Sequence, residues 1–525
     1  MSSKTPFNPE EPKDSSKVFN KILNLRNSIP VAAVVVGSTL GSMNSADAVT
    51  MTEADSWGDG IGVIGTALAD NTAVNVDGFA MTINKESDIG AITDTNSVAN
   101  AGDILITSAA ANVDFAVTIV SATSEGFTNI TTLDADNSDM NVQFEGNFDT
   151  NQTLNIVSTE SSANDNLTVN FDGNVTTVGA MTVVADGGSG VASHVNISMA
   201  GNFTTGNADS TLDDNAGGLS TLTFDGTGAQ TVTKEIKGTG VSEGTVVNAN
   251  TGNTVTFAEE LGRGNQLLAI THNTGSTTIH SVATDAVTIT SAGTETYTIG
   301  DLQADTINKT AGTMTLDTNN GNDIINNIAG NANTDMNMSA DTILNITIAA
   351  SETGNLGAVI DGTADGEGTL NIFNTNTGAG GVVTVEGIIG GTKKLAAINI
   401  GKATVAGSVD FTAAVSTTGA VTLTGGNDGA EDTIVDAGAS VTAGSIVLNV
   451  ASTGDATFKI TEDATITGAM DKTGAGAGEA NLSITANEST FVNSIGGTTA
   501  LDDIAILNAG TIIAKADVKA TLTTL

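Results

Sequence analysis

The feature that most constrains the fold is a strand-and-corner pattern that returns at intervals of about 27 residues, within the range of roughly 20 to 50 residues that indicates a solenoid or an array of stacked units. Three alternating stretches end in a Gly-Asn pair, at Gly146, Gly173 and Gly201, and a weaker copy ends at Gly226. Glycine and asparagine accept the left-handed backbone angles of a tight corner. Alternation of aliphatic and polar residues is typical of a strand with one buried face.

A second motif recurs in the C-terminal half. The segments 257–270, 385–398 and 491–504 align without gaps. In each, an apolar residue is followed four positions later by Leu or Ile, then by a glycine-containing turn, a Leu and finally an Ile. The aligned residues are Leu261, Ile389 and Ile495, then Leu267, Leu395 and Leu501, and last Ile270, Ile398 and Ile504. The separation of the last two copies is compatible with four steps of the first repeat.

Proline is confined to the segment 1–48, at Pro6, Pro9, Pro12 and Pro30. Proline removes a hydrogen-bond donor from a strand ladder and is restricted to edges, turns and bulges. Independent domains joined by linkers would normally use it in turns and hinges. We therefore predict an all-β fold, a repetitive β-solenoid of the parallel β-helix kind, with Val, Ile, Leu and Phe in a continuous core. A string of tandem, immunoglobulin-like β-sandwiches is the alternative.

Residues 1–48 have the pattern of a cleaved secretory signal peptide. Basic residues at Lys17, Lys21 and Arg26 precede an apolar stretch at 29–40, and the sequence Ala-Asp-Ala at 46–48 offers a signal-peptidase site. A membrane anchor is the alternative, but roughly a dozen apolar residues cannot cross ~30 Å of hydrocarbon as a helix. No later apolar segment is long enough to span the membrane, so we expect no transmembrane segment after signal removal.

The remaining chain divides into three regions by its repeats. Residues 49–140 show neither motif clearly and form an N-terminal β region that could anchor or cap the protein. Residues 141–256 carry the first repeat, with its period of about 27 residues. Residues 257–525 carry the second motif.

Composition excludes several classes of function. The chain has 59 acidic and 17 basic residues, a net charge of −42, whereas nucleic-acid binding needs clustered Lys and Arg. Cysteine is absent, which excludes disulfides, thiolate zinc sites and cysteine nucleophiles. Aromatic residues make up only 3%, too few for a large ligand pocket. Among three histidines, His194 is predicted to face solvent. No GxSxG, P-loop or HExxH motif is present, so we predict a protein that is not an enzyme.

Closely spaced acidic residues suggest calcium as a ligand. Calcium takes six to eight oxygen ligands, which Asp and Asn in turns can supply. Such residues are also favoured in plain solvated turns. The candidate ligands are Asp134, Asp136 and Asp139, then Asp361, Asp365 and Glu367, then Asp428, Glu431 and Asp432, and finally Asp323 in a segment that partly echoes the turn of calcium-binding β-rolls.

The segments GTLNIFN (368–374), IIGGTKKLAAINI (388–400) and SIGGTTALDDIAI (494–506) resemble the strand repeats of large bacterial surface proteins. These include the passenger regions of rickettsial surface-layer autotransporters. The absence of Cys, the low pI and the abundance of Thr, Ala, Gly and Asn are also similar to S-layer proteins. The resemblance covers about the last two thirds of the chain after residue 48. An autotransporter ends in a membrane barrel with aromatic girdles, whereas the C-terminal ADVKATLTTL has no such features, so the chain is either another kind of surface protein or a fragment.

The resemblance implies a structural, extracellular cell-surface protein. It would be an S-layer-type lattice subunit that self-assembles into a homo-oligomer with calcium, anchored to envelope polysaccharide or lipopolysaccharide. The alternative is an adhesin or autotransporter-type passenger presented singly at the cell surface. Neither function involves nucleic acid.

Overall fold

A computed structural model describes most of residues 140–524 and, before residue 140, the strands alone. The gaps after residue 140 are 161–165, 187–192, 207, 216, 252, 274–275, 281–283, 293, 299–301, 312, 319–334, 349–352, 375–380, 428–431 and 508–510. The predicted signal peptide at 1–48 lies outside the described residues.

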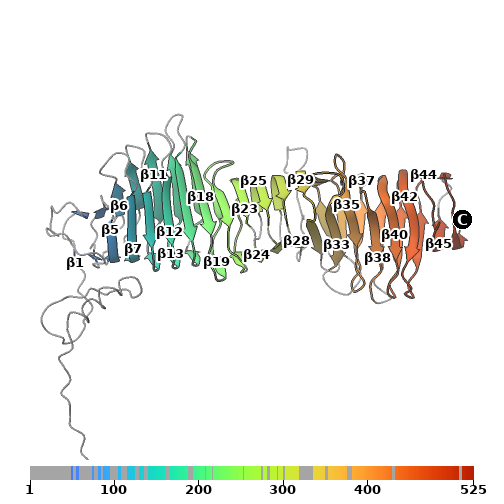
Figure 1. The fold of residues 1–525 in the computed structure, drawn as a ribbon, viewed down its shortest axis with the longest axis horizontal. Coiled ribbons are helices and arrows are strands. Elements are labelled where there is room, and N and C mark those ends of the chain that lie inside the picture. The colour runs from blue at the N-terminus through green and yellow to red at the C-terminus, as the bar shows by residue number, and fades with distance from the viewer. Residues whose placement is uncertain are drawn as a thin grey trace, which may run out of the picture.

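Every pair of strands in the described part of the chain is parallel, and a typical strand pairs with the strand one turn earlier and one turn later. The run β9 (Met140–Phe144), β12 (Asn166–Phe171), β15 (His194–Met199) and β18 (Leu219–Phe224) is representative. Figure 1 shows the strands stacked along the long axis of the molecule. This arrangement confirms the predicted β-solenoid, and the alternative of tandem antiparallel sandwiches is wrong.

The repeat regions form one ladder. β7 (Phe115–Ser124) pairs with β9 across residue 140, and β22 (Val255–Phe257) pairs with β24 (Ser276–His280) across residue 256. The sequence boundaries at these points therefore separate motif types and do not interrupt the sheet.

Besides the 31-stranded sheet, the solenoid has a further face at each of its two ends, which we call the third face. The described strands between the two ends do not extend it. One eight-stranded sheet runs from β2 (Asp55–Trp57) to β20 (Ile236–Gly238), and a second runs from β31 (Thr353–Leu356) to β47 (Ala520–Thr524). Between them the described strands belong to the 31-stranded sheet alone. The turns are shorter here. The steps from His272 to its partner Ser291 and from Ser291 to Lys309 contain only about two thirds as many residues as a Gly-Asn repeat. The stack is accordingly narrower at its centre (Figure 1).

One column of inward-facing side chains can be followed from turn to turn through this core. In the N-terminal half it is apolar, with Phe144 and Phe171 stacked at a centroid distance of 5.0 Å. Burying such rings supplies the main stabilisation of each turn, because apolar surface leaves water and neighbouring rings pack closely. The paired residues are Ile119, Phe144, Phe171, Met199 and Phe224, all at most 1% exposed.

The same column becomes polar at the narrow centre. From Phe224 the pairing continues through Asn248, His272, Ser291 and Lys309 before returning to Met338, and none is more than 2% exposed. Lys309 Nζ donates a 2.7 Å hydrogen bond to Ser291 Oγ. Burial, together with the positive charge of Lys309, lowers the pKa of His272 to about 3, so this imidazole is neutral in the folded protein.

The Gly-Asn corners stack directly on one another. A Cβ atom at Gly173 would lie 2.5 Å from the carbonyl carbon and oxygen of Gly146, and one at Gly201 would lie 2.3 Å from the carbonyl oxygen of Gly173. Only a residue without a Cβ lets consecutive corners approach this closely. The regular spacing of the first repeat therefore reflects corners packed backbone against backbone.

The second motif is another corner. Leu261, Ile389 and Ile495 each form a single parallel bridge with the preceding turn. The glycine that follows each of them has a positive φ of 83°, 66° or 63°, and its amide donates to the turn below. A strand begins shortly afterwards in every copy: β23 (Leu267–His272), β35 (Leu395–Ile400) and β45 (Leu501–Ile506).

Candidate functional site

The predicted calcium ligands divide into described and undescribed residues. Asp361, Asp365, Glu367 and Asp432 are described with their side chains, and Asp134 is described only as the last residue of β8 (Asn129–Asp134). Asp136, Asp139, Asp323, Asp428 and Glu431 lie outside the described residues. In the described part of the chain, no three His, Cys, Asp or Glu side chains gather closely enough to hold a metal ion.

Asp361 supports the corner of the second motif. Both of its carboxylate oxygens accept from the backbone amide of Thr392 in the next turn, at 3.2 and 3.3 Å. Asp471 does the same in the last copy, where Oδ1 accepts from the amides of Thr498 and Thr499 at 2.8 and 3.2 Å. A carboxylate that accepts backbone amides forms strong, charge-assisted hydrogen bonds, so Asp361 has a structural partner that the sequence did not reveal.

Asp365 and Glu367 belong to a loop that the chain uses twice. Residues 236–245 (IKGTGVSEGT) and 360–369 (IDGTADGEGT) adopt the same turn. Glu243 Oε2 accepts from the Gly240 amide at 2.6 Å, and Glu367 Oε2 accepts from the Ala364 amide at 2.8 Å. Gly244 and Gly368 have φ values of 75° and 74°. This likeness could have been found by aligning the chain with itself.

The two loops share one acidic position, which is Glu243 in the first loop and Glu367 in the second. Lys237 stands where the other loop has Asp361, and Val241 stands where it has Asp365. Asp365 Oδ1 accepts from the Lys394 amide at 2.9 Å, and Asp432 Oδ1 accepts from the Asp455 amide at 3.1 Å. The structure thus brings Asp361, Asp365 and Glu367 into one region but directs each carboxylate to backbone amides.

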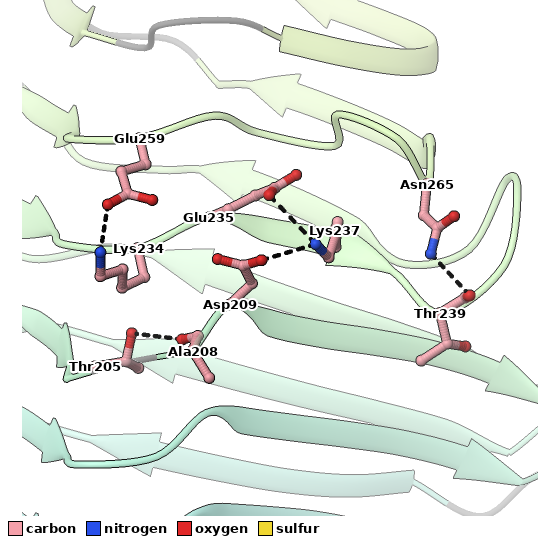
Figure 2. A network of polar contacts seen from close by, with 9 residues as sticks. All are labelled: Thr205, Ala208, Asp209, Lys234, Glu235, Lys237, Thr239, Glu259 and Asn265. Carbon is pink, nitrogen blue, oxygen red and sulfur yellow. Dashed lines mark hydrogen bonds and ion pairs between the residues drawn. The ribbon is translucent and has the colours of Figure 1, made fainter.

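Among the described residues, the densest network of charged side chains lies at the N-terminal third-face sheet, which runs from β2 to β20 (Figure 2). Lys237 Nζ is 2.8 Å from Asp209 Oδ2 and 3.4 Å from Glu235 Oε2, and Lys234 pairs with Glu259 of the following turn. Ser210 pairs with Ile236, which places the residues before them at the same corner of successive turns. Lysine here bridges acidic residues that would otherwise repel one another.

Burial, more than any neighbouring charge, raises the pKa of Glu235, and the nearby Lys237 opposes that rise. The pKa of Lys237 is raised by its hydrogen bond to Asp209, and it therefore stays charged. On the same sheet, burial and the neighbouring carboxylate of Glu243 raise the pKa of Asp213. The outward Asp213 and Lys237 make this a charged face, beside which Glu235 is buried.

A column of charged side chains also lies on the C-terminal third-face sheet, which runs from β31 to β47. Asp410 of β36 (Ser408–Phe411) pairs with Asp436 of β39 (Thr433–Ala437). Burial and the adjacent Asp436 carboxylate raise the pKa of Asp410. Both third-face sheets therefore display acidic residues to solvent.

The histidines differ in environment. His194 faces outward and is partly exposed, as predicted, whereas His272 is in the buried polar column. The side chain of His280 lies outside the described residues. Sequence reasoning missed the column because a strand's inward register is not visible where the turn length changes.

Neither a protein-family model, nor a curated protein, nor a solved structure matches this chain. Among the residues that the structure describes there is no helix long and apolar enough to cross a membrane.

Proposed function

We propose that this protein is a structural subunit of a cell-surface layer, exported by its N-terminal signal and assembled with copies of itself. The observation that carries the proposal is the single ladder of parallel turns with one shared core. Such a rod has a fixed length and a rigid surface that repeats at the strand spacing of about 4.8 Å. Repetition of this kind suits lateral assembly better than turnover of a small substrate.

The polar side chains of the corners support a structural role. Asp361, Asp471, Glu243 and Glu367 hold turns in place through backbone amides. Lys237 joins Glu235 of its own turn to Asp209 of the preceding turn. These carboxylates thus stabilise the rod, and its surface remains available for contacts with other molecules.

Calcium and an envelope polysaccharide or lipopolysaccharide complete the proposal as ligand and anchor. A net charge of −42 makes copies repel one another at close range. Divalent cations bound to each copy would reduce that repulsion, and calcium favours carboxylate oxygens. Cations bound along the acidic faces that bear Asp213, Asp410 and Asp436 would lower the charge of each copy, while the contact between copies lies elsewhere.

Analytical ultracentrifugation of the purified chain, with calcium or with EGTA, tests this function. We expect reversible association into large, regular particles with calcium, seen as sheets by negative-stain microscopy. A chain that stays monomeric at millimolar calcium and high protein concentration would contradict the proposal and would favour an adhesin presented singly.

A further inference from the structure

We propose that copies of this chain contact one another through an uncharged face on the N-terminal half of the solenoid. The inference rests on the proposed function, because it names the surface through which assembly occurs. The strands that form the face are β9, β12, β15, β18, β21 (Thr245–Asn248), β23 and β25 (Thr284–Ser291).

Two columns of outward-facing side chains run along these strands. They follow directly from the strand register and from burial that alternates residue by residue. We call these residues the neutral face: Asn141, Thr168, Asn196, Thr221, Thr245, Ala269 and Thr288 in one column, and Gln143, Asn170, Ser198, Thr223, Val247, Thr271 and Thr290 in the other. None of them is ionisable.

The contrast with the adjoining third face is large. There the outward positions of β14 (Met181–Asp186), β17 (Ser210–Asn215) and β20 include Asp186, Asp213 and Lys237. Two copies that met through this sheet would bring carboxylates within the Debye length of about 8 Å at physiological salt. Two copies that met through the neutral face would keep most of their charge further apart.

The chemistry of the neutral face is complementary to itself. Threonine, serine, asparagine and glutamine side chains each donate and accept hydrogen bonds, so the same face can pair with its symmetry copy. Both copies present rows at the same strand spacing, which lets side chains interdigitate. Threonine is β-branched and loses little rotamer freedom on contact. A second copy of this chain is therefore the occupant that the face fits.

The size of the face sets the expected strength. Two columns of side chains span about 13 Å along the strands and are stacked over roughly 30 Å, which gives about 400 Å² per copy. A stable dimer usually buries about 800 Å² per partner. Pairwise association should consequently be weak and become strong when many contacts form together. Carboxylates flank one edge, where Asp172 accepts from Gln143 Nε2 at 2.9 Å and Asp225 accepts from Ser198 Oγ at 2.6 Å.

The test is the double variant Thr221→Glu/Thr245→Glu, whose residues are paired neighbours on the neutral face. The matched control is Thr182→Glu/Thr211→Glu, a paired couple of outward threonines on the charged sheet. A third variant, Thr221→Asn/Thr245→Asn, keeps hydrogen bonding without charge. Sedimentation velocity in calcium at physiological salt measures association, and circular dichroism checks folding.

We expect association at least tenfold weaker for Thr221→Glu/Thr245→Glu and close to wild type for the control and the Asn variant. Equal association of both Glu variants would overturn the inference and leave the proposed function intact, as would a loss confined to the control. Failure of the unmodified chain to associate would overturn both.

A labelling experiment keeps the inference testable if the Glu variant misfolds. The chain has no cysteine, so Thr223→Cys and Thr182→Cys each accept a single nitroxide. In assembled protein, spin coupling between copies should be strong at position 223 and weak at position 182. The reverse result would contradict contact through the neutral face.

Discussion

Asn174 donates its backbone amide to the side-chain oxygen of Asn147, one turn earlier, at 3.0 Å. Its own side-chain oxygen accepts the amide of Asn202 at 2.9 Å, and Asn202 in turn accepts the amide of Thr231 at 2.8 Å. A ladder of asparagine side chains thus accepts one backbone amide from each following turn, including the amides of Asn174 and Asn202 at the Gly-Asn corners.

Replacing Asn174 with alanine should weaken this corner by about 0.5–1.5 kcal/mol, because the Asn202 amide loses its acceptor. Hydrogen exchange at the Asn202 amide is the direct measurement and should accelerate. Asn174→Asp keeps an oxygen at the same place and should protect this amide. Unchanged exchange in the alanine variant would show that the ladder contributes nothing.

A methyl group at Gly173 should be far more damaging than one at Gly228. The Cβ of Gly173→Ala would overlap the Gly146 carbonyl at 2.5 Å, whereas a Cβ at Gly228 meets nothing within 4 Å. We expect a loss of about 1–3 kcal/mol for Gly173→Ala and a change within about 0.5 kcal/mol for Gly228→Ala. Urea unfolding midpoints measure both, and similar midpoints would rule out corner stacking as described.

Lys237→Met should destabilise the protein by about 1–3 kcal/mol at pH 7, since the largely buried Glu235 carboxylate loses its hydrogen-bonded cation. The folded pKa of Glu235 is already raised, and loss of Lys237 should raise it further. Protonation then stabilises the folded state, so the deficit should shrink as the pH falls through the raised folded pKa and be smallest below about pH 4.5.

Thermal unfolding at pH 7 and pH 4 measures this difference. Lys234→Met is the control, because the Lys234–Glu259 pair is more exposed and should matter little. A deficit for Lys237→Met that is equal at both pH values would contradict a charge-based role.

His272 should make stability fall on mild acidification. Its folded pKa of about 3 lies below its ordinary value of 6.5, so the unfolded chain binds a proton between these values and the folded chain does not. The stabilisation is complete above pH 6.5 and is progressively lost as pH falls toward 3. Between pH 7.5 and pH 5 the loss should be about 2 kcal/mol.

His272→Asn removes this titration, and its stability relative to wild type should therefore improve by about that amount over the same range. Chemical denaturation at the two pH values measures the change. Parallel pH profiles for the two proteins would place His272 in solvent instead of the core.

The solenoid was predictable because its corners carry a chemical signature at a fixed spacing. Gly146, Gly173 and Gly201 recur where backbones pack together, and Leu261, Ile389 and Ile495 recur before a left-handed glycine. Both signals are local, so sequence alone reveals them. The register of each strand between corners is less visible, since either alternating face could point inward.

The role of Asp361 could not be predicted for a related reason. The sequence places Asp361 beside Asp365 and Glu367, which suggested a shared calcium ion. Its hydrogen-bond partner, Thr392, lies in the following turn and becomes a neighbour only once the turns stack. The polar column that contains His272 and Lys309 could not be predicted either. Its members become neighbours only through the register of the shortened turns.

Electron microscopy of the native cell envelope, with the chain labelled by antibody, tests the central claim most directly. An ordered array that carries the label and is lost on treatment with EGTA is the predicted result. Label on scattered single rods, or on no regular layer with or without calcium, would contradict a coat subunit.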